Sequence, residues 1–233
     1  MTPGMSAERK LRRGGARPAD SVGPIARALR RQTPGPRITR EGAARAAARV
    51  TDSAWRSGLS DLAYSWADSP FGRLLVAVSR RGLVRVAYPE RDPDGQIEEL
   101  SRLVSPRILE SAPATDEVRR ELDEYFAGRR TDFDVSVDLR PVQGFTRRVL
   151  QATARIPFGS VRTYRDVATR AGNALATRAA GNALGANPIP IVVPCHRVVR
   201  TGGGLGGYTG GLDRKEALLR LEGFLPGTAR PIG

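Results

Sequence analysis

The stretch NPIPIVVPCHRVV (residues 187–199) holds the only cysteine and the only histidine of this 233-residue chain. Its aliphatic run, 191–193, predicts a short buried strand that leads directly into Cys195. A lone cysteine is most often a small buried hydrophobic residue. This one lies beside His196 and near Arg197, and cationic neighbours favour the nucleophilic thiolate. A strand would point His196 to the opposite face, so a Cys–His pair needs a turn or a bridging water.

A glycine-rich loop and an acidic helix end follow this stretch. Seven of the ten residues 202–211 are glycine, interrupted by Tyr208 and Thr209 among others. Such a loop either approaches a ligand closely or is simply flexible, and it lacks the lysine of a phosphate-binding loop. A leucine-bearing helix is predicted next, and Glu222 falls at its end, where a carboxylate opposes the helix dipole. Glu222 therefore needs a partner, unless its placement is accidental.

Two short helices precede the cysteine. Thr163 is a typical N-cap for the first, which carries apolar residues at helical spacing and stops at Gly172. The second, over 176–184, has an alanine-rich apolar side and stops at Gly185. The pair predicts a helix-turn-helix, in which a helix of small residues would suit a narrow groove. Taken alone, the alanine-rich helix fits tight helix packing better than a groove.

The middle of the chain predicts a separate small domain over 61–139. Alternating apolar residues over 74–78 and 84–88 flank a glycine-containing turn and predict a β-hairpin. A helix is predicted from Thr115 to Gly128, and 133–137 reads as another strand. This α+β domain shows no catalytic constellation of its own.

Charge divides the chain into three parts. The net charge of +14 comes from +9 over residues 1–60, −5 over 61–139 and +10 over 140–233. The basic blocks indicate a polyanionic partner, although a generally arginine-rich composition would give the same totals. Residues 1–60 are rich in Gly, Pro, Ala and Arg, and we expect a mostly disordered tail with a helix possible over 40–50.

Composition excludes several classes of protein. No apolar run reaches the roughly 20 residues of a membrane helix, and no secretory signal follows the basic N-terminus. One cysteine allows no internal disulfide, and with one histidine it cannot form an ordinary structural zinc site. We therefore expect a cytoplasmic protein that uses no metal and no cofactor.

The sequence resembles the O6-alkylguanine-DNA alkyltransferase family (methylated-DNA–protein-cysteine methyltransferases) over about residues 64–224. The stretches that carry the resemblance are NPIPIVVPCHRVV (187–199), GGYTGG (206–211), IPFG (156–159), TY (163–164), RAAG (178–181) and, more weakly, SPFG (69–72) and YFAG (125–128). Any one of them is weak alone, but together they are specific.

The resemblance implies an α+β protein with a ribonuclease-H-like N-terminal domain over 61–139. A helical, winged helix-turn-helix domain over 140–226 would then bind DNA and hold the active site, with a short tail over 227–233. The implied partner is double-stranded DNA carrying O6-alkylguanine, entered from the minor groove by a monomer that flips the damaged base out.

The resemblance also implies a role for each site residue. Cys195 would take the alkyl group once and irreversibly from O6-alkylguanine, with O4-alkylthymine as a second candidate substrate, after activation by His196 and Glu222 through a water. The implied sets are Cys195, His196, Glu222, Tyr164 and Asn187 for catalysis; Thr163, Arg178, Ala179 and Arg197 for DNA binding; and Tyr164, Val198, Tyr208 and Thr209 for base binding. Within them, Tyr164 would donate toward the departing guanine, and Arg178 would fill the gap left by the flipped base.

Two positions depart from the family pattern, Thr209, where serine is frequent, and Ala180, where valine is common. Other function classes stay open at this point: a non-catalytic protein that only marks the lesion, and a helix-turn-helix regulator. The cysteine argues against the first, because such relatives lack it. A cysteine hydrolase is disfavoured because the chain has no second histidine.

Overall fold

A computed structural model describes residues 39–225 except 89 and 91. Most of the expected basic tail and the C-terminal tail expected over 227–233 lie outside the described residues. The chain from Ala44 onward forms one compact unit. No helix among the described residues combines the length and apolar character needed to cross a membrane.

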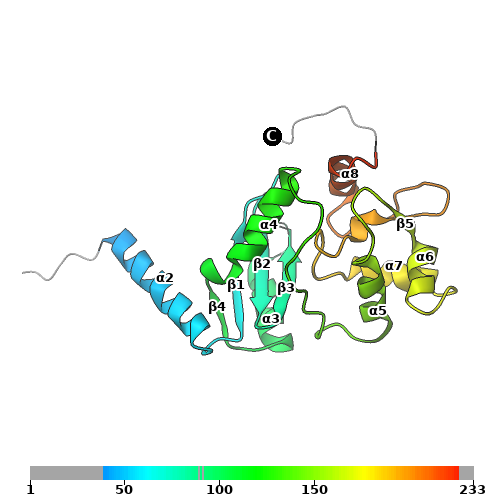
Figure 1. Cartoon of the computed structure of the whole chain (residues 1–233). Coiled ribbons are helices and arrows are strands. Elements are labelled where there is room, and N and C mark those ends of the chain that lie inside the picture. The colour runs from blue at the N-terminus through cyan, green and yellow to red at the C-terminus, as the bar shows by residue number, and fades with distance from the viewer. Residues whose placement is uncertain (1–38, 89, 91, 226–233) are drawn as a thin grey trace, which may run out of the picture. The chain divides into compact units, whose positions relative to one another are not determined.

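A four-stranded sheet forms the N-terminal half of this unit (Figure 1). Its strands are β1 (Leu62–Ala67), β2 (Leu74–Ser79), β3 (Gly82–Ala87) and β4 (Ile108–Glu110). Their order is β3-β2-β1-β4, with β4 parallel to β1 and the other pairs antiparallel. The predicted hairpin is confirmed as β2 and β3.

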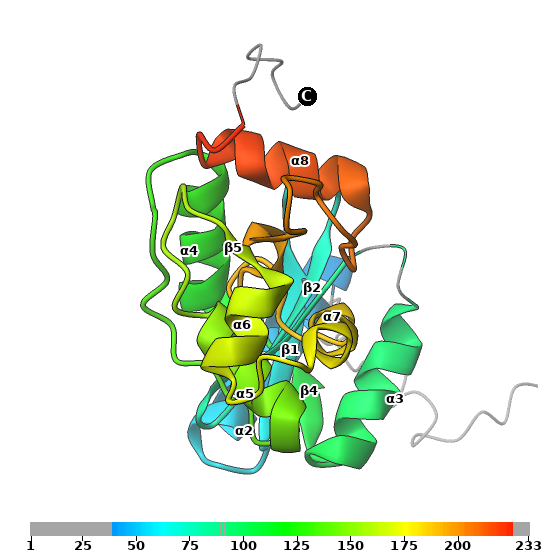
Figure 2. The ribbon, with the colours of Figure 1, turned by 90° about the vertical axis from the view of Figure 1, so that its right-hand side faces the viewer.

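Helices cover both faces of the sheet, because its strands bury apolar side chains on each side. Helix α3 (Pro93–Leu103) packs Leu100 against one face, and α4 (Asp116–Phe126) packs Leu122 and Tyr125 against the other. Figure 2 shows the two helices on opposite sides of β1 and β2. The predicted helix from Thr115 is confirmed. Thr115 itself lies in the short 3₁₀ turn η1 (Pro113–Thr115), where its hydroxyl bonds Ser65 and does not cap α4.

The strand predicted over 133–137 is wrong. Val137 alone pairs with β3, through an isolated bridge to Leu83. The buried Glu121 carboxylate of α4 accepts the backbone amides of Asp134 and Val135 at 2.9 and 3.3 Å. A side chain therefore takes the hydrogen bonds that a neighbouring strand would need.

The C-terminal half is mainly helical, and its helices lie beside the sheet (Figure 1). Its elements are α5 (Gly144–Thr153), β5 (Arg162–Thr163), α6 (Tyr164–Arg170), α7 (Thr177–Gly185), η2 (Cys195–Arg197), β6 (Val198–Val199) and α8 (Leu212–Leu221). Strands β5 and β6 pair in parallel, which brings the start of α6 beside the cysteine-bearing stretch.

The predicted helix-turn-helix is confirmed as α6 and α7. The Thr163 hydroxyl accepts the Asp166 amide while the Asp166 carboxylate accepts the Thr163 amide, a capping box that fixes where α6 begins. Gly172 ends the helix with φ 92°, a conformation that glycine adopts without strain. In α7, Ala180 and Ala183 are buried, whereas Ala179 is exposed.

The expected tail over 1–60 is corrected in its described part. Helix α2 (Arg40–Arg56) occupies most of it, although none of its residues is buried. The end of the helix is tied down, because the Arg80 guanidinium stacks 3.7 Å from the Trp55 ring and donates to the Trp55 carbonyl. Order therefore extends at least from residue 40, not from about 61.

Candidate active site

A tight turn presents Cys195, and the strand predicted over 191–193 is not formed. Ile191 adopts φ 75°, a left-handed conformation that is costly for a β-branched side chain. Asn187 braces the turn from inside: its Oδ1 accepts the Ile189 amide, and its Nδ2 donates to the Val193 carbonyl at 2.8 Å and to Cys195 Sγ at 3.1 Å. Asn187, expected in the catalytic set, thus contacts both the turn and the sulfur atom.

His196 follows in the 3₁₀ turn η2 and points into the protein. Its Nε2 lies 2.8 Å from Glu222 Oε1, and both side chains are fully buried. Because an ionised carboxylate can only accept, Nε2 carries the proton and Nδ1 has a free lone pair. Nδ1 is buried and makes no hydrogen bond with any described residue. The imidazole is therefore oriented as a base.

The Glu222 carboxylate lies at the C-terminal end of α8, where the helix dipole disfavours a negative charge. Several hydrogen-bond donors stabilise it there. Arg197 donates Nε to Oε2 at 2.8 Å and Nη2 to Oε1 at 2.9 Å, and the Tyr125 hydroxyl donates to Oε1 at 2.7 Å. The remaining Nη1 of Arg197 donates to the Ile156 carbonyl. The DNA contact expected for Arg197 is therefore wrong, since its guanidinium is used inside the protein.

A cavity of about 170 Å³ opens onto Cys195. The residues that line it come from α6, α7, η2 and the glycine-rich loop: Tyr164, Gly181, Leu184, Gly185, Cys195, Gly207, Tyr208 and Thr209. The expected base-binding residues Tyr164, Tyr208 and Thr209 are thus brought together with the thiol. Val198 is fully buried and does not line the cavity.

Small residues make this convergence sterically feasible. A Cβ on Gly206 would lie 2.6 Å from the Tyr164 hydroxyl, so the loop approaches that ring only as glycine. Thr209 donates its hydroxyl to the Gly185 carbonyl at 3.1 Å and so attaches the loop to the end of α7. At this position, where the family more often has serine, the threonine hydroxyl therefore bonds to the protein itself.

Lys215 is a functional residue that the sequence analysis missed. It is fully buried, and its ammonium donates to the carbonyls of Val198, Leu205 and Gly207. It thereby ties the loop to the strand after Cys195 and places a positive charge near the thiol. The available signal was compositional: only two of the 38 basic residues are lysine, and a compact ammonium can fit among three carbonyls where a planar guanidinium would not.

Burial keeps the thiol protonated at rest. It raises the pKa of Cys195 to about 11, although the Asn187 hydrogen bond and the Lys215 charge act in the opposite direction. Burial lowers the pKa of His196 despite its bond to Glu222, so the imidazole is neutral. Burial disfavours the Glu222 anion, but hydrogen bonds from His196 and Arg197 outweigh this and lower its pKa to about 2. The site therefore holds a neutral thiol, a neutral base and an ionised carboxylate.

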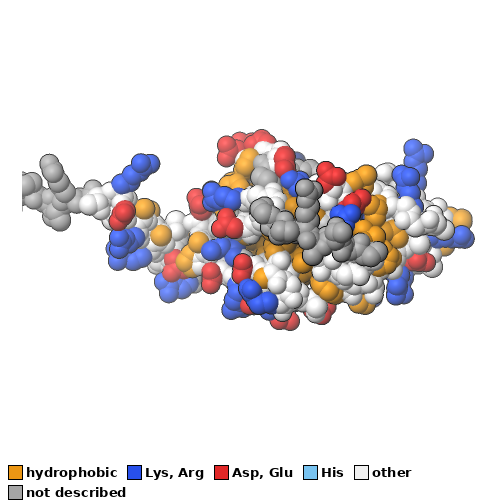
Figure 3. All heavy atoms as spheres, turned by 90° about the horizontal axis from the view of Figure 1, so that it is seen from above, with side chains coloured by type: hydrophobic (Ala, Val, Ile, Leu, Met, Phe, Trp, Pro, Cys, Tyr) orange, Lys and Arg blue, Asp and Glu red, His pale blue; other side chains and the backbone are white. Residues whose placement is uncertain are grey.

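Basic side chains gather on the segment from α5 to α7. Residues 144–185 contain seven arginines and a single acidic residue. Figure 3, which views the molecule from above, shows mainly basic side chains at the end that holds α6. Arg178 and Ala179 are exposed on α7, whereas the hydroxyl of Thr163 is occupied by its cap.

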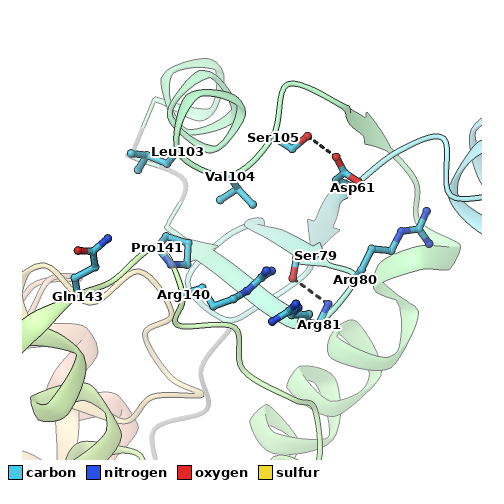
Figure 4. Close-up of a pocket in the computed structure, with 10 residues that line it drawn as sticks. All are labelled: Asp61, Ser79, Arg80, Arg81, Leu103, Val104, Ser105, Arg140, Pro141 and Gln143. Atoms are coloured by element: carbon cyan, nitrogen blue, oxygen red, sulfur yellow. Dashed lines mark hydrogen bonds between the residues drawn. The ribbon is translucent and has the colours of Figure 1, made fainter.

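A larger cavity lies away from the cysteine. It measures about 450 Å³ and opens between the β2–β3 turn, the segment after α3 and the linker before α5 (Figure 4). Two of its three arginines are already paired: Arg80 donates to the Ser60 carbonyl, and Arg140 pairs with Asp138 at 2.6 Å. Its serine hydroxyls donate to carboxylates that accept other hydrogen bonds as well, Ser105 to Asp61 and Ser79 to Asp138, and neither cysteine nor histidine lines it, so we assign the chemistry to the smaller cavity.

Two family models match the chain. Residues 62–139 match "6-O-methylguanine DNA methyltransferase, ribonuclease-like domain", and residues 144–224 match "6-O-methylguanine DNA methyltransferase, DNA binding domain". These matches confirm the expected fold class, a ribonuclease-like α+β domain followed by a helical DNA-binding domain.

Curated relatives cover the same region. A methylated-DNA–protein-cysteine methyltransferase of Mycolicibacterium paratuberculosis is 43% identical over 162 residues, which are 68% of this chain and 91% of that protein. The protein of the same name from Methanosarcina acetivorans is 38% identical over 160 residues, 69% of this chain and 97% of its own length.

Solved structures agree with these relatives. A Mycobacterium tuberculosis O6-methylguanine methyltransferase has a TM-score of 0.61 at 38% identity, covering 71% of this chain and 96% of that one. Mycobacterium tuberculosis OGT in complex with DNA has a TM-score of 0.60 at 39% identity, covering 69% and 92%.

Acid should destabilise the fold in two steps. The pKa of His196 is lowered from 6.5 and that of Glu222 from 4.5 to about 2, so the unfolded chain binds more protons than the folded one below these values. We expect the free energy of unfolding to fall from about pH 6.5 downward and more steeply below 4.5. Urea unfolding across this range measures it. Glu222→Gln should make the loss below pH 4.5 shallower but not remove it, because the pKa of Asp138 is lowered too, whereas Glu117→Gln, on the exposed face of α4, should leave the loss unchanged. A wild-type stability independent of pH over the range would contradict the assignment.

Replacing Lys215 by methionine should slow the reaction of Cys195. The change removes the charge at similar length and leaves three carbonyls without their donor, so the loop loosens and the cavity loses its shape. We expect alkylation of Cys195 to slow by about tenfold or more. Lys10→Met, at the only other lysine, is the matched control. An unchanged rate in the Lys215 variant would show that its contacts do not shape the site.

Proposed function

Since the chain belongs to the 6-O-methylguanine DNA methyltransferase family, we propose that it repairs DNA by transferring the alkyl group of O6-alkylguanine to Cys195. The observation that carries the assignment to this residue is the position of the thiol. Cys195 lines a cavity with two tyrosines, and it is followed by a buried base whose Nδ1 has no hydrogen-bond partner among the described residues. The same chemistry would apply to O4-alkylthymine, which also carries its alkyl group on an exocyclic oxygen.

His196 activates the thiol. A thiol with a pKa of about 11 is a poor nucleophile at neutral pH, so its proton must leave as the reaction begins. A water relays this proton to Nδ1 of His196, and the ionised Glu222 stabilises the imidazolium that forms. Asn187 and Lys215 stabilise the negative sulfur, one by a hydrogen bond and the other by its charge.

The thiolate then attacks the alkyl carbon, and the bond from that carbon to O6 breaks. The base leaves with a negative charge, which a proton from the Tyr164 hydroxyl neutralises. Tyr164 lies on the cavity wall and donates to the Gly207 carbonyl at 3.2 Å before the base enters. The proton lost by Cys195 finally restores Tyr164, so thiol and alkylguanine become thioether and guanine.

The product explains why each chain acts once. A thioether carries no proton and is a poor leaving group, and the site offers no second nucleophile to remove the alkyl group from sulfur. The protein is therefore consumed by the lesion that it repairs.

The helix-turn-helix brings DNA to this cavity. We infer that α7 enters the minor groove, because its exposed surface is built of small residues such as Ala179 that allow close approach. Arg178 projects from the same exposed surface and would occupy the space of the flipped base. The chain acts as a monomer in this proposal, since every proposed catalytic residue comes from one copy.

The acceptor can be tested by intact mass. Mixing the protein with a duplex containing O6-methylguanine should add one methyl group per chain, on Cys195, and transfer should stop at one equivalent. Cys195→Ser should fold and give no adduct. Sustained turnover, or a methyl group on any other residue, would overturn the proposal, and binding without transfer would favour the lesion-marking alternative.

Arg178 should matter for duplex DNA and not for the chemistry. Arg178→Ala should slow repair of a methylated duplex by about tenfold or more, because flipping costs a few kcal/mol that the side chain helps to offset. Its reaction with free O6-benzylguanine, which needs no flipping, should stay within about twofold of wild type. Arg170→Ala, at the exposed end of α6, controls for lost charge. Equal losses on both substrates would refute the role.

A further inference from the structure

The N-terminal domain contacts the wall of the active-site cavity through Tyr88. This tyrosine directly follows β3 and is 3% exposed. Its hydroxyl lies 2.6 Å from the Tyr208 hydroxyl, and the two rings meet edge to face with centroids 6.2 Å apart. Tyr208 is one of the residues that line the cavity at Cys195, so a residue outside the DNA-binding domain holds part of that wall.

The loop is shaped to allow this contact. A Cβ on Gly210 would lie 2.6 Å from the Tyr88 ring and 2.8 Å from the Tyr208 ring. The two rings therefore converge over a position that only glycine can occupy without displacing one of them. Contact with the N-terminal domain therefore explains why one of the seven loop glycines, Gly210, has no side chain.

Arg214 adds a second attachment from α8. Its guanidinium lies 4.5 Å from the centre of the Tyr88 ring, donates to the Gly210 carbonyl at 3.1 Å and pairs with Glu90. Its cationic group thus stacks on the same ring that bonds Tyr208. We call Tyr88, Tyr208, Gly210 and Arg214 the tyrosine clamp.

The clamp matters because the loop has little structure of its own. Glycine-rich backbone loses much entropy when it is ordered, so external contacts decide where the loop lies. Lys215 holds it at Leu205 and Gly207, and the clamp holds it at Tyr208 and Gly210. The Tyr208 ring also meets the His196 ring edge to face, with centroids 6.2 Å apart. The position of Tyr208 therefore affects both the width of the cavity and the packing of the His196 imidazole.

We propose that Tyr88 is a positioning residue which, through its hydrogen bond to Tyr208, limits the size of the alkyl group that Cys195 can accept. With the bond in place, Tyr208 is fixed and the cavity of about 170 Å³ favours small groups. Without it, Tyr208 is free to turn, which admits larger groups and weakens the alignment of small ones. The choice of alkylguanine substrates rests on the proposed function, whereas the contact between Tyr88 and Tyr208 does not depend on it.

The test compares two substrates in Tyr88→Phe, which keeps the ring and removes only the hydroxyl. Single-turnover rates are measured on duplexes carrying O6-methylguanine or O6-benzylguanine. We expect the benzyl-to-methyl rate ratio to rise by about fivefold, the effect of one lost hydrogen bond. A variant that is merely less stable lowers both rates together and leaves the ratio unchanged. Tyr64→Phe, the same change at a half-buried position on β1, should keep the wild-type ratio.

A double-mutant cycle identifies the contact. Tyr208→Phe removes the same hydrogen bond from the other side, so the double variant should show the ratio of either single variant. An unchanged ratio in Tyr88→Phe, or two independent effects that multiply in the double variant, would overturn the proposal.

Thiol reagents separate this inference from the proposed function. Cys195 is the only thiol, so its labelling by iodoacetamide and by the bulkier N-phenylmaleimide reports the access to the cavity without any DNA. The ratio of bulky to small reagent should rise in Tyr88→Phe by a similar factor. If wild type forms no alkyl adduct from DNA while this ratio rises, the function is wrong and the clamp stands. If transfer occurs and neither ratio changes, the clamp is wrong and the function stands.

Discussion

The buried carboxylate of Glu222 is the interaction on which the rest of the site depends. One group receives hydrogen bonds from Tyr125 of the N-terminal domain, from the imidazole of His196 and from the guanidinium of Arg197. A buried carboxylate is stable only when its lone pairs are satisfied, so these donors must all be in place. The same requirement that makes the anion tolerable fixes the tautomer of His196 and joins the two domains at the reacting centre.

Burial of the thiol lowers the resting reactivity of Cys195. Burial raises the pKa of Cys195, so the resting nucleophile is neutral and weakly reactive. Two groups act in the opposite direction and favour the thiolate, the Asn187 amide and the Lys215 ammonium. This arrangement suits a residue that can be used once, because reaction is tied to a substrate seated in the cavity.

Elements that are distant in sequence form and support the walls of the active site. The turn with Ile191 in a left-handed conformation places the cysteine, but Val86 of β3 donates to the Pro188 carbonyl at 2.9 Å and supports that turn from the sheet. The glycine-rich loop closes the other side, held by α8 through Lys215 and by Tyr88. The ribonuclease-like domain thus contributes no reacting group, yet it positions two walls of the site.

The sequence by itself determined the hairpin of β2 and β3, helix α4, the helix-turn-helix and the cysteine motif, because each depends on short-range periodicity, caps and glycine stops. Tertiary structure decided the rest. The aliphatic run at 191–193 reads as a strand but is a turn, because the Asn187 amide and the Ile189 carbonyl take up the backbone groups of Val193. From the sequence, Arg197 is expected to contact DNA. Only the folded structure places the Glu222 carboxylate, at the end of α8, against the Arg197 guanidinium inside the protein. Lys215 and Tyr88 gain their roles from partners that are remote in the chain, Lys215 from Val198 and Tyr88 from Tyr208. Local pattern fixes where a helix or hairpin forms, but pairing between distant side chains exists only after folding has brought them together.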